Sequence, residues 1–415
     1  DILRAVLTKG KPLDDALAEH DGLNMLPRRD RGFTRTIVGM TLRRLGQIDA
    51  VIAPLIRKPL PRQAMVVHDI LRLAVAELLL LDVAPHAAVD SAVKMVESRG
   101  HPKFKGLVNA VLRRVSREGA ERLKAVPVEQ NYQPWMIESW QTFFGTETAH
   151  AIAEYSLTHP PLDISVKSNT GEWAEKLDAI LLPTGTLRRE FDGAITDLPG
   201  FETGDWWVQD AAAALPAKLL GNVQSKRVFD LCAAPGSKTL QLASMGADVL
   251  AVDRSSKRLK RLERNLERMG LHAGVAVADI SGWTAPDPPD AILLDPPCTA
   301  TGTIRRHPDI LHAKGIGDLN KLISLQAKLL AKAAGMLQPG GRLVYCTCSQ
   351  QWEEGEAQAA RALTDLPLER DPVTVDELGG LDKLVTPDGD VRTGPHLYPK
   401  LGGFDGFFVA RFRRV

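Results

Sequence analysis

Six short apolar runs, separated by helix-length segments, most constrain how the later part of this chain can fold. The runs are RVFDLCAAPG, DVLAVDRS, AGVAVADI, DAILLDPP, GRLVYCTCS and FFVARFRRV, which begin at positions 227, 248, 273, 290, 341 and 407. Successive strands joined through helices pair in parallel, because the crossover returns the chain to the same end of the sheet. The pattern therefore predicts an α/β domain with a mostly parallel, doubly wound sheet over residues 206–415.

Residues 1–128 have a helical pattern throughout. Apolar residues recur at helical spacing in TRTIVGMTLRRLGQIDAVIAPLI, in AMVVHDILRLAVAELLLLDV and in HAAVDSAVKMVESRG. Prolines at positions 59, 61, 85 and 102 interrupt these stretches, as helix breakers do. This part of the chain is predicted to be an all-α bundle.

Residues 129–205 have a different pattern. The stretch KAVPVEQNYQPWMIESW, from position 124, is typical of a linker that runs into a short helix. Short strands and turns are expected in LDISVKSNT, LLPTGTLRREF and AITDLPGF, which predicts a small α+β module. A length of 415 residues also favours several domains.

Composition excludes several classes of protein. The chain is 44% hydrophobic and 25% charged, which is ordinary for a globular protein. Apolar stretches such as LRLAVAELLLLDVA, from Leu71, are shorter than the roughly 18–20 residues of a membrane span. The mixed charge of the opening stretch is unlike a cleavable signal, and four cysteines do not make a disulfide framework. We therefore expect a reduced, cytoplasmic protein with no membrane partner.

Positive charge is concentrated in the front of the chain. Residues 1–125 carry 22 Lys and Arg against 14 Asp and Glu, although the net charge of the whole chain is only +1. A basic module on an acidic body predicts contact with a polyanion, but ordinary solvated surface charge gives the same excess. The candidate phosphate contacts are Arg28, Arg29 and Arg31, with Arg113 and Arg114 at the close of the last helix of the bundle.

Ligands of a doubly wound sheet bind beyond the carboxyl ends of its strands, so the residues that close each run are informative. The first run ends in DLCAAPGSKT, where Gly236 allows a tight turn and a helix begins at once. This segment lacks the G-x-G-x-x-G of a dinucleotide site. Ser237 separates Gly236 from Lys238, which excludes a P-loop.

Acidic residues close the next three runs, at Asp253, Asp279 and Asp295. Such acids suit a ligand that has hydroxyl groups, an exocyclic amine and a positive centre, and they would repel a diphosphate. S-Adenosyl-L-methionine has all three features. A single Asp could equally cap a helix or a turn, but an acid at each strand end favours a ligand site.

The fourth run continues as DPPCTATGTIRRHPDI. A loop of the form D/N-P-P-aromatic would indicate methylation of an amino group, with the aromatic ring stacked on the base. Cys298 occupies the position of that aromatic residue. An amino-methyltransferase is therefore disfavoured.

Two of the four cysteines lie one residue apart at the end of the fifth run, in YCTCS. We expect the strand to end around Cys346, which would be buried as a small hydrophobic residue, with Cys348 just beyond it in the crevice. Four cysteines could instead form a tetrahedral zinc site. The C-x-C spacing is unusual for zinc, and the other two thiols end separate strands, so no metal is expected.

A nucleophilic role for the thiol beyond the fifth run accounts for more of these residues than a zinc site does. Carbon 5 of a pyrimidine becomes nucleophilic once a thiolate adds to carbon 6, and it can then attack a methyl donor. The ring nitrogen also needs an acid, and the final elimination needs help with a proton. Cys348, Asp295 and Cys298 can fill these roles.

Four segments closely resemble those of the RNA 5-methylcytosine methyltransferases: DLCAAPGSKT, VDRSSKRLKRLERNLERMG, ILLDPPCTATGTIRRHPDI and LVYCTCS. Within that family, ATGTIRRHPDI and the helical front of the chain are similar to the RsmB (Sun/Fmu) type. The resemblance covers nearly the whole chain. It implies a NusB-like RNA-binding first domain, an RRM-like middle module and a Rossmann-like class I methyltransferase domain.

The resemblance also implies a substrate and roles. Cys348 would be the nucleophile and Cys298 would assist release of the product, on a cytosine of small-subunit (16S) ribosomal RNA. The cofactor S-adenosyl-L-methionine would contact Cys232, Ala233, Ala234, Pro235, Gly236, Ser237, Lys238, Asp253, Asp279 and Asp295. We expect a monomer. The alternative is a NusB-like RNA-binding or antitermination factor with an inactive methyltransferase body, which the intact Cys348, Cys298 and Asp295 disfavour.

The chain departs from the family pattern at three places. Ser237 stands where a second glycine is usual, although its small side chain leaves room for the cofactor. Cys346 adds a thiol beside the nucleophile. The segment LHAKGIGDLNKL is less basic than expected for one that contacts the substrate.

Overall fold

The computed structural model describes residues 1–191, 193–285 and 287–415. The chain forms two compact units, and neither is a continuous stretch of sequence. The first unit comprises Asp1–Thr158 and Ile304–Gly315, and the second comprises His159–Thr303 and Ile316–Val415. A multidomain fold with a helical front and an α/β body is confirmed. The boundaries expected after positions 128 and 205 stay a prediction.

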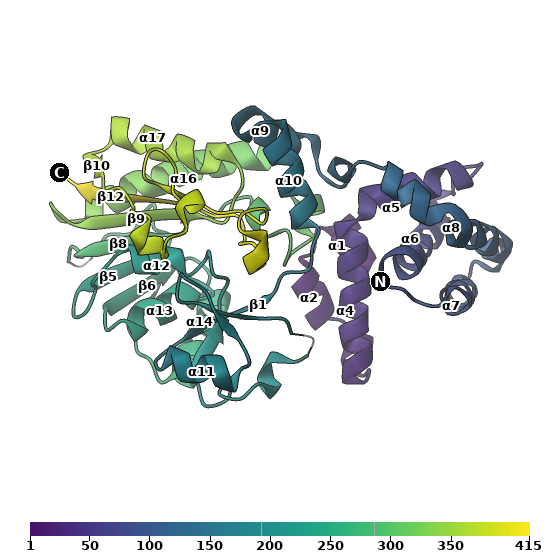
Figure 1. The fold of residues 1–415 in the computed structure, drawn as a ribbon, viewed down its shortest axis with the longest axis horizontal. Coiled ribbons are helices and arrows are strands. Elements are labelled where there is room, and N and C mark those ends of the chain that lie inside the picture. The colour runs from purple at the N-terminus through teal and green to yellow at the C-terminus, as the bar shows by residue number, and fades with distance from the viewer. Residues whose placement is uncertain (192, 286) are drawn as a thin grey trace. The chain divides into compact units, whose positions relative to one another are not determined.

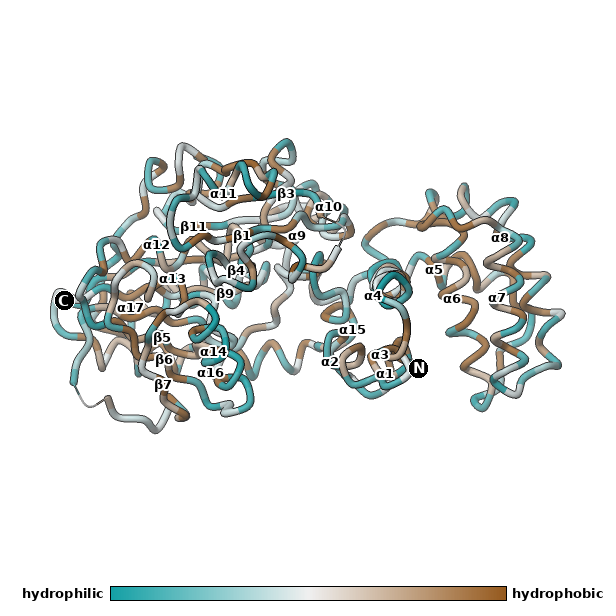
Figure 2. The backbone as a smooth tube through the Cα atoms, turned by 90° about the horizontal axis from the view of Figure 1, so that it is seen from below, coloured by the Kyte–Doolittle hydropathy of each residue, from teal (hydrophilic) through white to brown (hydrophobic). Residues whose placement is uncertain are grey.

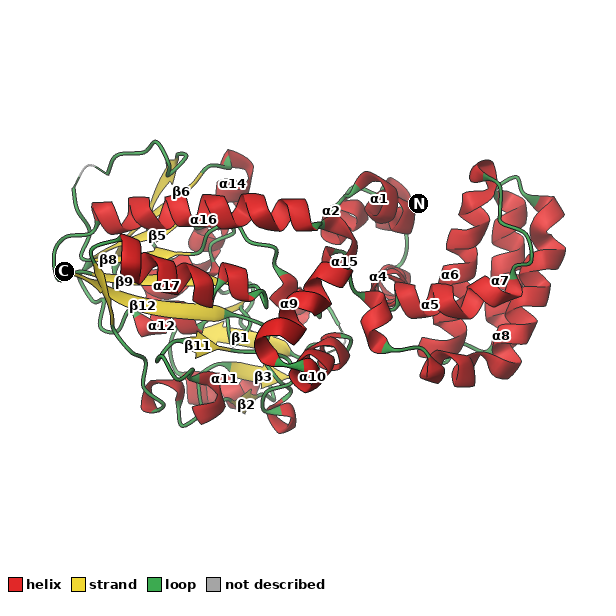
Figure 3. Ribbon diagram, turned by 90° about the horizontal axis from the view of Figure 1, so that it is seen from above, coloured by secondary structure: helices red, strands yellow, loops and turns green. Residues whose placement is uncertain are grey.

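The first unit is helical wherever it is ordered into regular elements (Figure 3). Its α-helices are α1 Ile2–Lys9, α2 Leu13–Ala18, α3 Asp21–Asn24, α4 Arg28–Arg43, α5 Leu45–Ile52, α6 Met65–Leu80, α7 Pro85–Ser98, α8 Lys105–Ala125, α9 Pro134–Phe144, α10 Thr146–Ser156 and α15 Ile310–Ala313. Its short 3₁₀ turns are η1 Ala53–Leu55, η2 Arg62–Ala64, η3 Pro102–Phe104 and η4 Val128–Asn131.

Apolar faces of α5, α6, α7 and α8 meet in one core, where Ile48, Leu71, Val96 and Leu112 are fully buried. Figure 2 shows hydrophobic and hydrophilic stretches alternating along these helices. Each helix therefore contributes one stripe to the core, as the helical spacing of the apolar residues predicts. The prolines act as expected, since Pro85 is the first residue of α7 and Pro102 the first of η3.

A sheet of eight strands forms the centre of the second unit, in the order β10-β12-β9-β8-β5-β6-β7, with β11 paired to β12. The strands are β5 Arg227–Leu231, β6 Asp248–Asp253, β7 Gly274–Val277, β8 Ala291–Leu294, β9 Arg342–Thr347, β10 Leu368–Arg370, β11 Val391–Arg392 and β12 Phe408–Arg414. Strands β5 to β9 pair in parallel, and β12 is antiparallel to β9. All six apolar runs of the sequence are thus strands of one sheet.

Helices cover both faces of this sheet: α16 and α17 lie on one face, and α12, α13 and α14 on the other (Figure 1). Their bounds are α12 Leu215–Leu219, α13 Ser237–Ser244, α14 Ser256–Met269, α16 Ile316–Met336 and α17 Glu356–Asp365, and the 3₁₀ turns are η6 Thr301–Thr303, η7 Trp352–Glu354, η8 Asp376–Leu378, η9 Asp382–Leu384 and η10 Pro399–Leu401. Alternate residues of β9 enter different cores. Val344 packs on the side of α12, whereas Tyr345 packs on the side of α16. Burial of both faces explains why the runs are continuously apolar.

A smaller antiparallel sheet, in the order β2-β3-β1-β4, belongs to the same unit. Its elements are β1 Leu162–Val166, α11 Thr170–Lys176, β2 Ile180–Leu181, β3 Leu187–Arg189, η5 Ile195–Asp197 and β4 Trp206–Val208. Arg188 of β3 ties this sheet to the body, because it donates to the carbonyl oxygens of Leu401 and Gly403. Within the sheet Arg188 also forms a buried ion pair with Asp163 of β1 and binds both of its oxygens, each at 2.6 Å. Such a bidentate pair fixes geometry as well as adding energy.

No helix in the described part of the chain is both long and apolar enough to cross a membrane. This agrees with the shortness of the apolar stretches in the sequence.

Substitution of Gly204 by Ala should destabilise the second unit more than substitution of Gly270. Both residues have left-handed φ values, of +70° and +59°, so Ala at either position costs about 1–2 kcal/mol of backbone strain. At Gly204 the added Cβ would also lie 1.9 Å from the carbonyl oxygen of Arg268, whereas at Gly270 nothing lies within 4 Å. Urea unfolding of the two variants measures the difference. Equal losses would contradict the close approach of these two segments.

Candidate active site

The loop after β5 turns sharply into α13. Cys232 has φ +64°, the Ala234–Pro235 bond is cis, and Gly236 has φ +107°. A Cβ on Gly236 would lie 2.5 Å from Cγ of Leu262 in α14, so only glycine lets the loop pack this closely. The tight turn expected at Gly236, with a helix beginning at Ser237, is confirmed.

Asp253 is the last residue of β6 and is buried. Its carboxylate accepts hydrogen bonds from the backbone N–H of Ala234 at 3.2 Å and of Ser255 at 2.8 Å. It therefore connects the loop after β5 with the loop after β6. Each carboxylate oxygen has two lone pairs, so these two bonds leave capacity for hydroxyl donors of a ligand.

Asp279 lies two residues beyond β7 and is exposed. Its Oδ1 accepts from the side-chain hydroxyl of Ser281 at 2.7 Å and from the backbone N–H of Ser281 at 2.9 Å. These bonds lower the pKa of Asp279. One carboxylate oxygen of Asp279 thus closes a turn, which is the purely structural role that the sequence left open for any single Asp.

Asp295 follows β8 directly and forms an ion pair with Lys238 of α13, Nζ to Oδ2 at 2.7 Å. Burial by itself would lower the pKa of Lys238, but the neighbouring groups that raise it, led by Asp295, together outweigh burial and hold it above the usual value. Lys238 therefore stays charged. Its Nζ also lies 5.5 Å from the ring centroid of Phe407. Sequence analysis identified both Lys238 and Asp295 as site residues, but it did not predict their ion pair. This ion pair joins the loops after β5 and β8.

The two thiols named as catalytic candidates lie side by side. Cys298 is in the loop after β8, Cys348 follows β9 directly, and their sulfur atoms are 3.4 Å apart. Cys346 is fully buried within β9, in the core on the side of α12, as expected for a small hydrophobic residue. The strand ends at Thr347, one residue later than expected, so Cys348 lies just beyond it.

The hydrogen bond with Cys348, followed by burial, raises the pKa of Cys298 well above its usual value. Cys298 therefore keeps its proton at neutral pH and can donate it to the sulfur of Cys348. A thiol donor at this distance stabilises negative charge on its neighbour, and the thiolate is the nucleophilic form of cysteine. The two sulfur atoms thus form one hydrogen-bonded contact, in which either thiol can be the donor.

Glu354 was not found by sequence reasoning. Its buried carboxylate, at the end of η7, accepts hydrogen bonds from Thr299 and Ser349, the residues that follow the two thiols. An acid in the polar stretch QQWEEGE gives no signal of this role, because Thr299 lies 55 residues away in the sequence.

The predicted site residues therefore gather at the carboxyl ends of β5, β6, β8 and β9, with Asp279 at the end of the outer strand β7. This is the edge of the sheet where ligands of doubly wound folds bind. The described residues contain no group of three or more His, Cys, Asp or Glu placed to hold a metal ion.

Comparison with known proteins identifies the family. The family model described as 16S rRNA methyltransferase RsmB/F matches residues 217–413, and that of the NusB family matches residues 1–117. The chain is 34% identical to ribosomal RNA small subunit methyltransferase B of Pseudomonas putida, over 100% of this chain and 97% of that protein. This match shows that the chain belongs to the 16S rRNA methyltransferase RsmB/F family. The same protein of Cronobacter sakazakii is 31% identical, over 99% of this chain and 96% of its own length.

Solved structures agree. The crystal structure of PH0851 superposes with a TM-score of 0.78, at 25% sequence identity, over 100% of this chain and 97% of that one. A methyltransferase homologue from Pyrococcus horikoshii has a TM-score of 0.55 and 26% identity, over 68% of this chain and 100% of its own. The chain is therefore an S-adenosyl-L-methionine-dependent methyltransferase with a NusB-like front domain.

The residues present fit this cofactor. Gly236 leaves room for a ligand at the start of α13, and Asp253 offers a buried carboxylate with free lone pairs for hydroxyl groups. Asp279 and Asp295 add negative charge around a cationic ligand.

We expect Asp253→Ala to weaken binding of S-adenosyl-L-methionine by about 1–3 kcal/mol, because a ribose hydroxyl would lose its buried acceptor. Asp279→Ala is the matched control, since that acid is exposed and already bonds within its own turn. Asp279→Ala should lose less affinity for the cofactor than Asp253→Ala does. Titration calorimetry on folded protein measures both affinities. Unchanged affinity in Asp253→Ala would refute the assignment.

Proposed function

We propose that this enzyme methylates carbon 5 of a specific cytosine in 16S ribosomal RNA, in the cytoplasm, through a covalent bond between Cys348 and carbon 6. The observation that carries the proposal is the 3.4 Å contact between the Cys298 and Cys348 sulfur atoms, with the Asp295 charge near enough to act on Cys298. Support for the substrate comes from relatives named as small-subunit rRNA methyltransferases that match nearly the whole chain. Action as a monomer, without a metal, stays a prediction.

In the proposed reaction the Cys348 thiolate adds to carbon 6 of the cytosine. The ring nitrogen takes up a proton from water, and the Asp295 carboxylate, which Lys238 holds in place, accepts a hydrogen bond from the protonated nitrogen and stabilises it. Carbon 5 then carries the electron density of an enamine. S-Adenosyl-L-methionine supplies the methyl group when it is bound.

In the last step, Cys298 accepts the proton that leaves carbon 5. The largest cause of its raised pKa is its bond with Cys348, and that cause disappears once the Cys348 sulfur is bonded to carbon 6. Cys298 can then release its proton to water and accept the proton from carbon 5. Cys348 leaves as the thiolate, the ring nitrogen loses its added proton, and the original pair is restored with one proton released overall.

Cys348→Ala should abolish methyl transfer to RNA, because no other described thiol contacts Cys298. Cofactor affinity should stay within about twofold, since the thiol binds RNA rather than the methyl donor. Transfer of tritiated methyl groups to 16S rRNA measures turnover, and nucleoside mass spectrometry identifies the modified base. Normal formation of 5-methylcytosine by this variant would show that Cys348 is not the nucleophile.

Cys298→Ala should instead stop the reaction after methyl transfer, leaving the enzyme bound covalently to RNA. The reason is that elimination needs a proton acceptor beside carbon 5. A slowly migrating protein band that disappears on nuclease treatment reports the adduct, and the double variant with Cys348→Ala is its control. If Cys298→Ala forms no adduct, Cys298 does not take the proton.

A binding factor with an inactive methyltransferase body is not favoured. The relatives that match over the full chain are named as methyltransferases, and the 3.4 Å contact of the two thiols supports a chemical role. A factor that only binds RNA has no use for this arrangement.

We further propose that the front domain binds rRNA through a groove of about 770 Å³ between α7 and α8. Arg113 and Arg117 line it one helical turn apart. Neither has an ion-pair partner among the described residues. Arg114 instead pairs with Glu118 at 2.7 Å, a carboxylate that it shares with Arg122. Because α8 continues to Ala125, these arginines lie in its middle rather than at its end.

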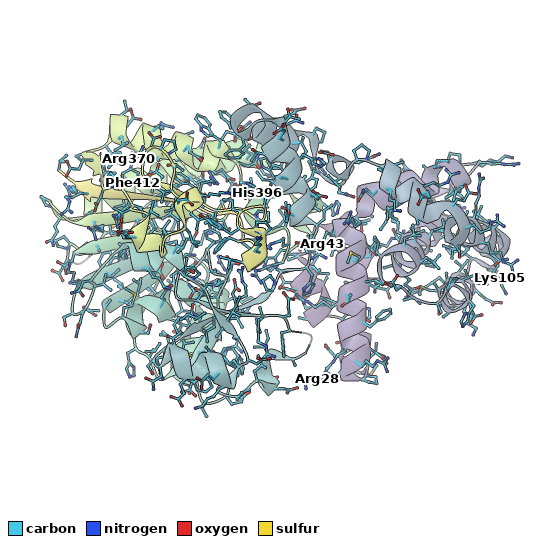
Figure 4. The ribbon with its side chains drawn as sticks, viewed as in Figure 1. Arg28, Arg43, Lys105, Arg370, His396 and Phe412 are labelled. Carbon is cyan, nitrogen blue, oxygen red and sulfur yellow. The ribbon has the colours of Figure 1, made fainter. Side chains whose placement is uncertain are left out.

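Other basic residues surround this groove or lie nearer the N-terminus. Lys105, at the start of α8, lines the groove but pairs with Glu97 at 2.9 Å. Arg28, Arg29 and Arg31 are exposed in the first turn of α4, and Arg28 and Lys105 are labelled in Figure 4. They stay candidate phosphate contacts.

Combined substitution Arg113→Ala and Arg117→Ala should weaken rRNA binding and flatten its dependence on salt. For single-stranded RNA the slope of log affinity against log salt should change by about 0.7 for each lost phosphate contact. Arg114→Ala is the matched control and should change the slope less. Fluorescence anisotropy at several salt concentrations tests this, and equal slopes for wild type and the double variant would overturn it.

A further inference from the structure

The two thiols of the site come from loops that no covalent bond joins. Cys298 and Cys348 are 50 residues apart, yet their sulfur atoms lie 3.4 Å from each other. The complete proposed reaction needs both at one cytosine, Cys348 for addition and Cys298 for the final elimination, so their separation must be held. The contacts around the two loops identify what holds it.

Both loops donate to one carboxylate. The backbone N–H of Thr299, next to Cys298, donates to Glu354 Oε1 at 3.0 Å, and its hydroxyl donates to Oε2. The hydroxyl of Ser349, next to Cys348, donates to Oε2 at 2.6 Å. Thr299, Ser349 and Glu354 are all fully buried. A single acid thus bridges the residues that follow the two thiols.

A third element completes the set of donors. The side-chain amide of Gln326, in α16, donates to Glu354 Oε1 at 2.8 Å and to the carbonyl oxygen of Pro297 at 2.9 Å. Pro297 precedes Cys298, so the residues on both sides of this thiol are tied to the same network. Gln326 is also fully buried.

The backbone of Glu354 is attached to the strand that leads to Cys348. Its carbonyl oxygen accepts from the hydroxyl of Tyr345 at 2.8 Å and from that of Thr347 at 3.3 Å, both in β9. The main chain of Glu354 therefore follows β9, while its side chain reaches the loop after β8. The hydrogen bonds of Glu354 go to Thr299, Ser349, Gln326, Tyr345 and Thr347 rather than to either sulfur, so it acts through these neighbours.

Stability alone gives no reason for this acid. No Lys, Arg or His among the described residues forms an ion pair with Glu354. Burial raises its pKa, which the hydrogen bonds of Ser349, Thr299 and Gln326 oppose. A buried carboxylate without a paired cation is costly even when it is hydrogen-bonded, and apolar residues of similar volume are often as stable or more so. Its four donors instead fix a geometry.

We propose that Glu354 is a positioning residue that sets the distance between Cys298 and Cys348. This proposal rests on the proposed function for its catalytic consequence, but not for its geometry. A carboxylate is suited to the task, because its two oxygens accept from two backbone or amide N–H groups and two hydroxyls at once.

The first experiment measures steady-state methylation of 16S rRNA. Glu354→Ala should lower kcat by about 100-fold, as expected when reacting groups move by about 1 Å. The KM for S-adenosyl-L-methionine should stay nearly unchanged, since Gly236 and Asp253 lie on other loops. Glu354→Gln should recover most of the rate, because its oxygen can replace Oε1 and the two hydroxyls can turn to accept from its amide.

Asp390→Ala is the matched control. Asp390 is also a buried acid with a raised pKa, of about 6 through burial, but it pairs with Arg370 and bonds to neither thiol loop. If Asp390→Ala lowers kcat as much as Glu354→Ala does, the loss reflects removal of a buried acid in general, and the proposal is overturned.

The second experiment measures thiol proximity without the methylation reaction. Hydrogen peroxide oxidises two thiols to a disulfide and is reduced to two waters, so the rate of Cys298–Cys348 bond formation reports their separation. Peptide mapping with fragmentation distinguishes Cys348 from Cys346. The rate should fall at least about tenfold in Glu354→Ala, and little in Glu354→Gln or Asp390→Ala. Ser349→Ala, which removes one donor, replaces Glu354→Ala if that variant does not fold.

The two experiments separate the two proposals. If the disulfide rate is the same with and without Glu354, its positioning role is wrong, whatever the activity. If that rate depends on Glu354 while the wild-type enzyme forms no 5-methylcytosine, the geometry is right and the proposed reaction is wrong.

Discussion

The site depends on the reversal of strand order between β5 and β8. From β5 the chain builds outward through β6 and β7, and then returns to place β8 and β9 on the other side. Loops that follow β5 and β8 leave the sheet toward opposite faces, which opens a crevice at its carboxyl edge. The Lys238–Asp295 pair spans this edge, and the close packing at Gly236 lets α13 begin there.

The negative charges of two acids near the thiols, Asp295 and Glu354, are stabilised in different ways. Asp295 is balanced by a cation and remains partly exposed, so it can meet a substrate. Glu354 is balanced by hydrogen-bond donors alone and is fully buried, so it can hold loops but not touch a base. Because an ionised group in a dry interior is stabilised only by groups already in place, both acids depend on the fold being complete.

The two units are interleaved in sequence. After η6 the chain enters the helical unit at Ile304 and leaves it at Gly315. Within that unit Arg43 donates to the carbonyl oxygen of Arg305 at 2.6 Å, and burial lowers the pKa of Arg43 to about 10. His312 contacts the carbonyl oxygen of Leu42 at 2.9 Å. Part of the segment ATGTIRRHPDI therefore packs with the front helices rather than with the sheet that carries Cys298.

The sequence by itself determined six of the eight strands of the larger sheet (not β10 and β11), the turn at Gly236, the burial of Cys346 and the place of Cys348 just beyond a strand, because each follows from periodicity or from residues close along the chain. Even the pairing of Arg114 with Glu118, four residues on, was within reach of helical spacing. Only the tertiary structure decided which distant groups meet: Lys238 with Asp295, 57 residues apart, and Glu354 with Thr299, 55 residues apart. Such partners are set by how strands and loops pack in three dimensions, and no local pattern encodes that packing.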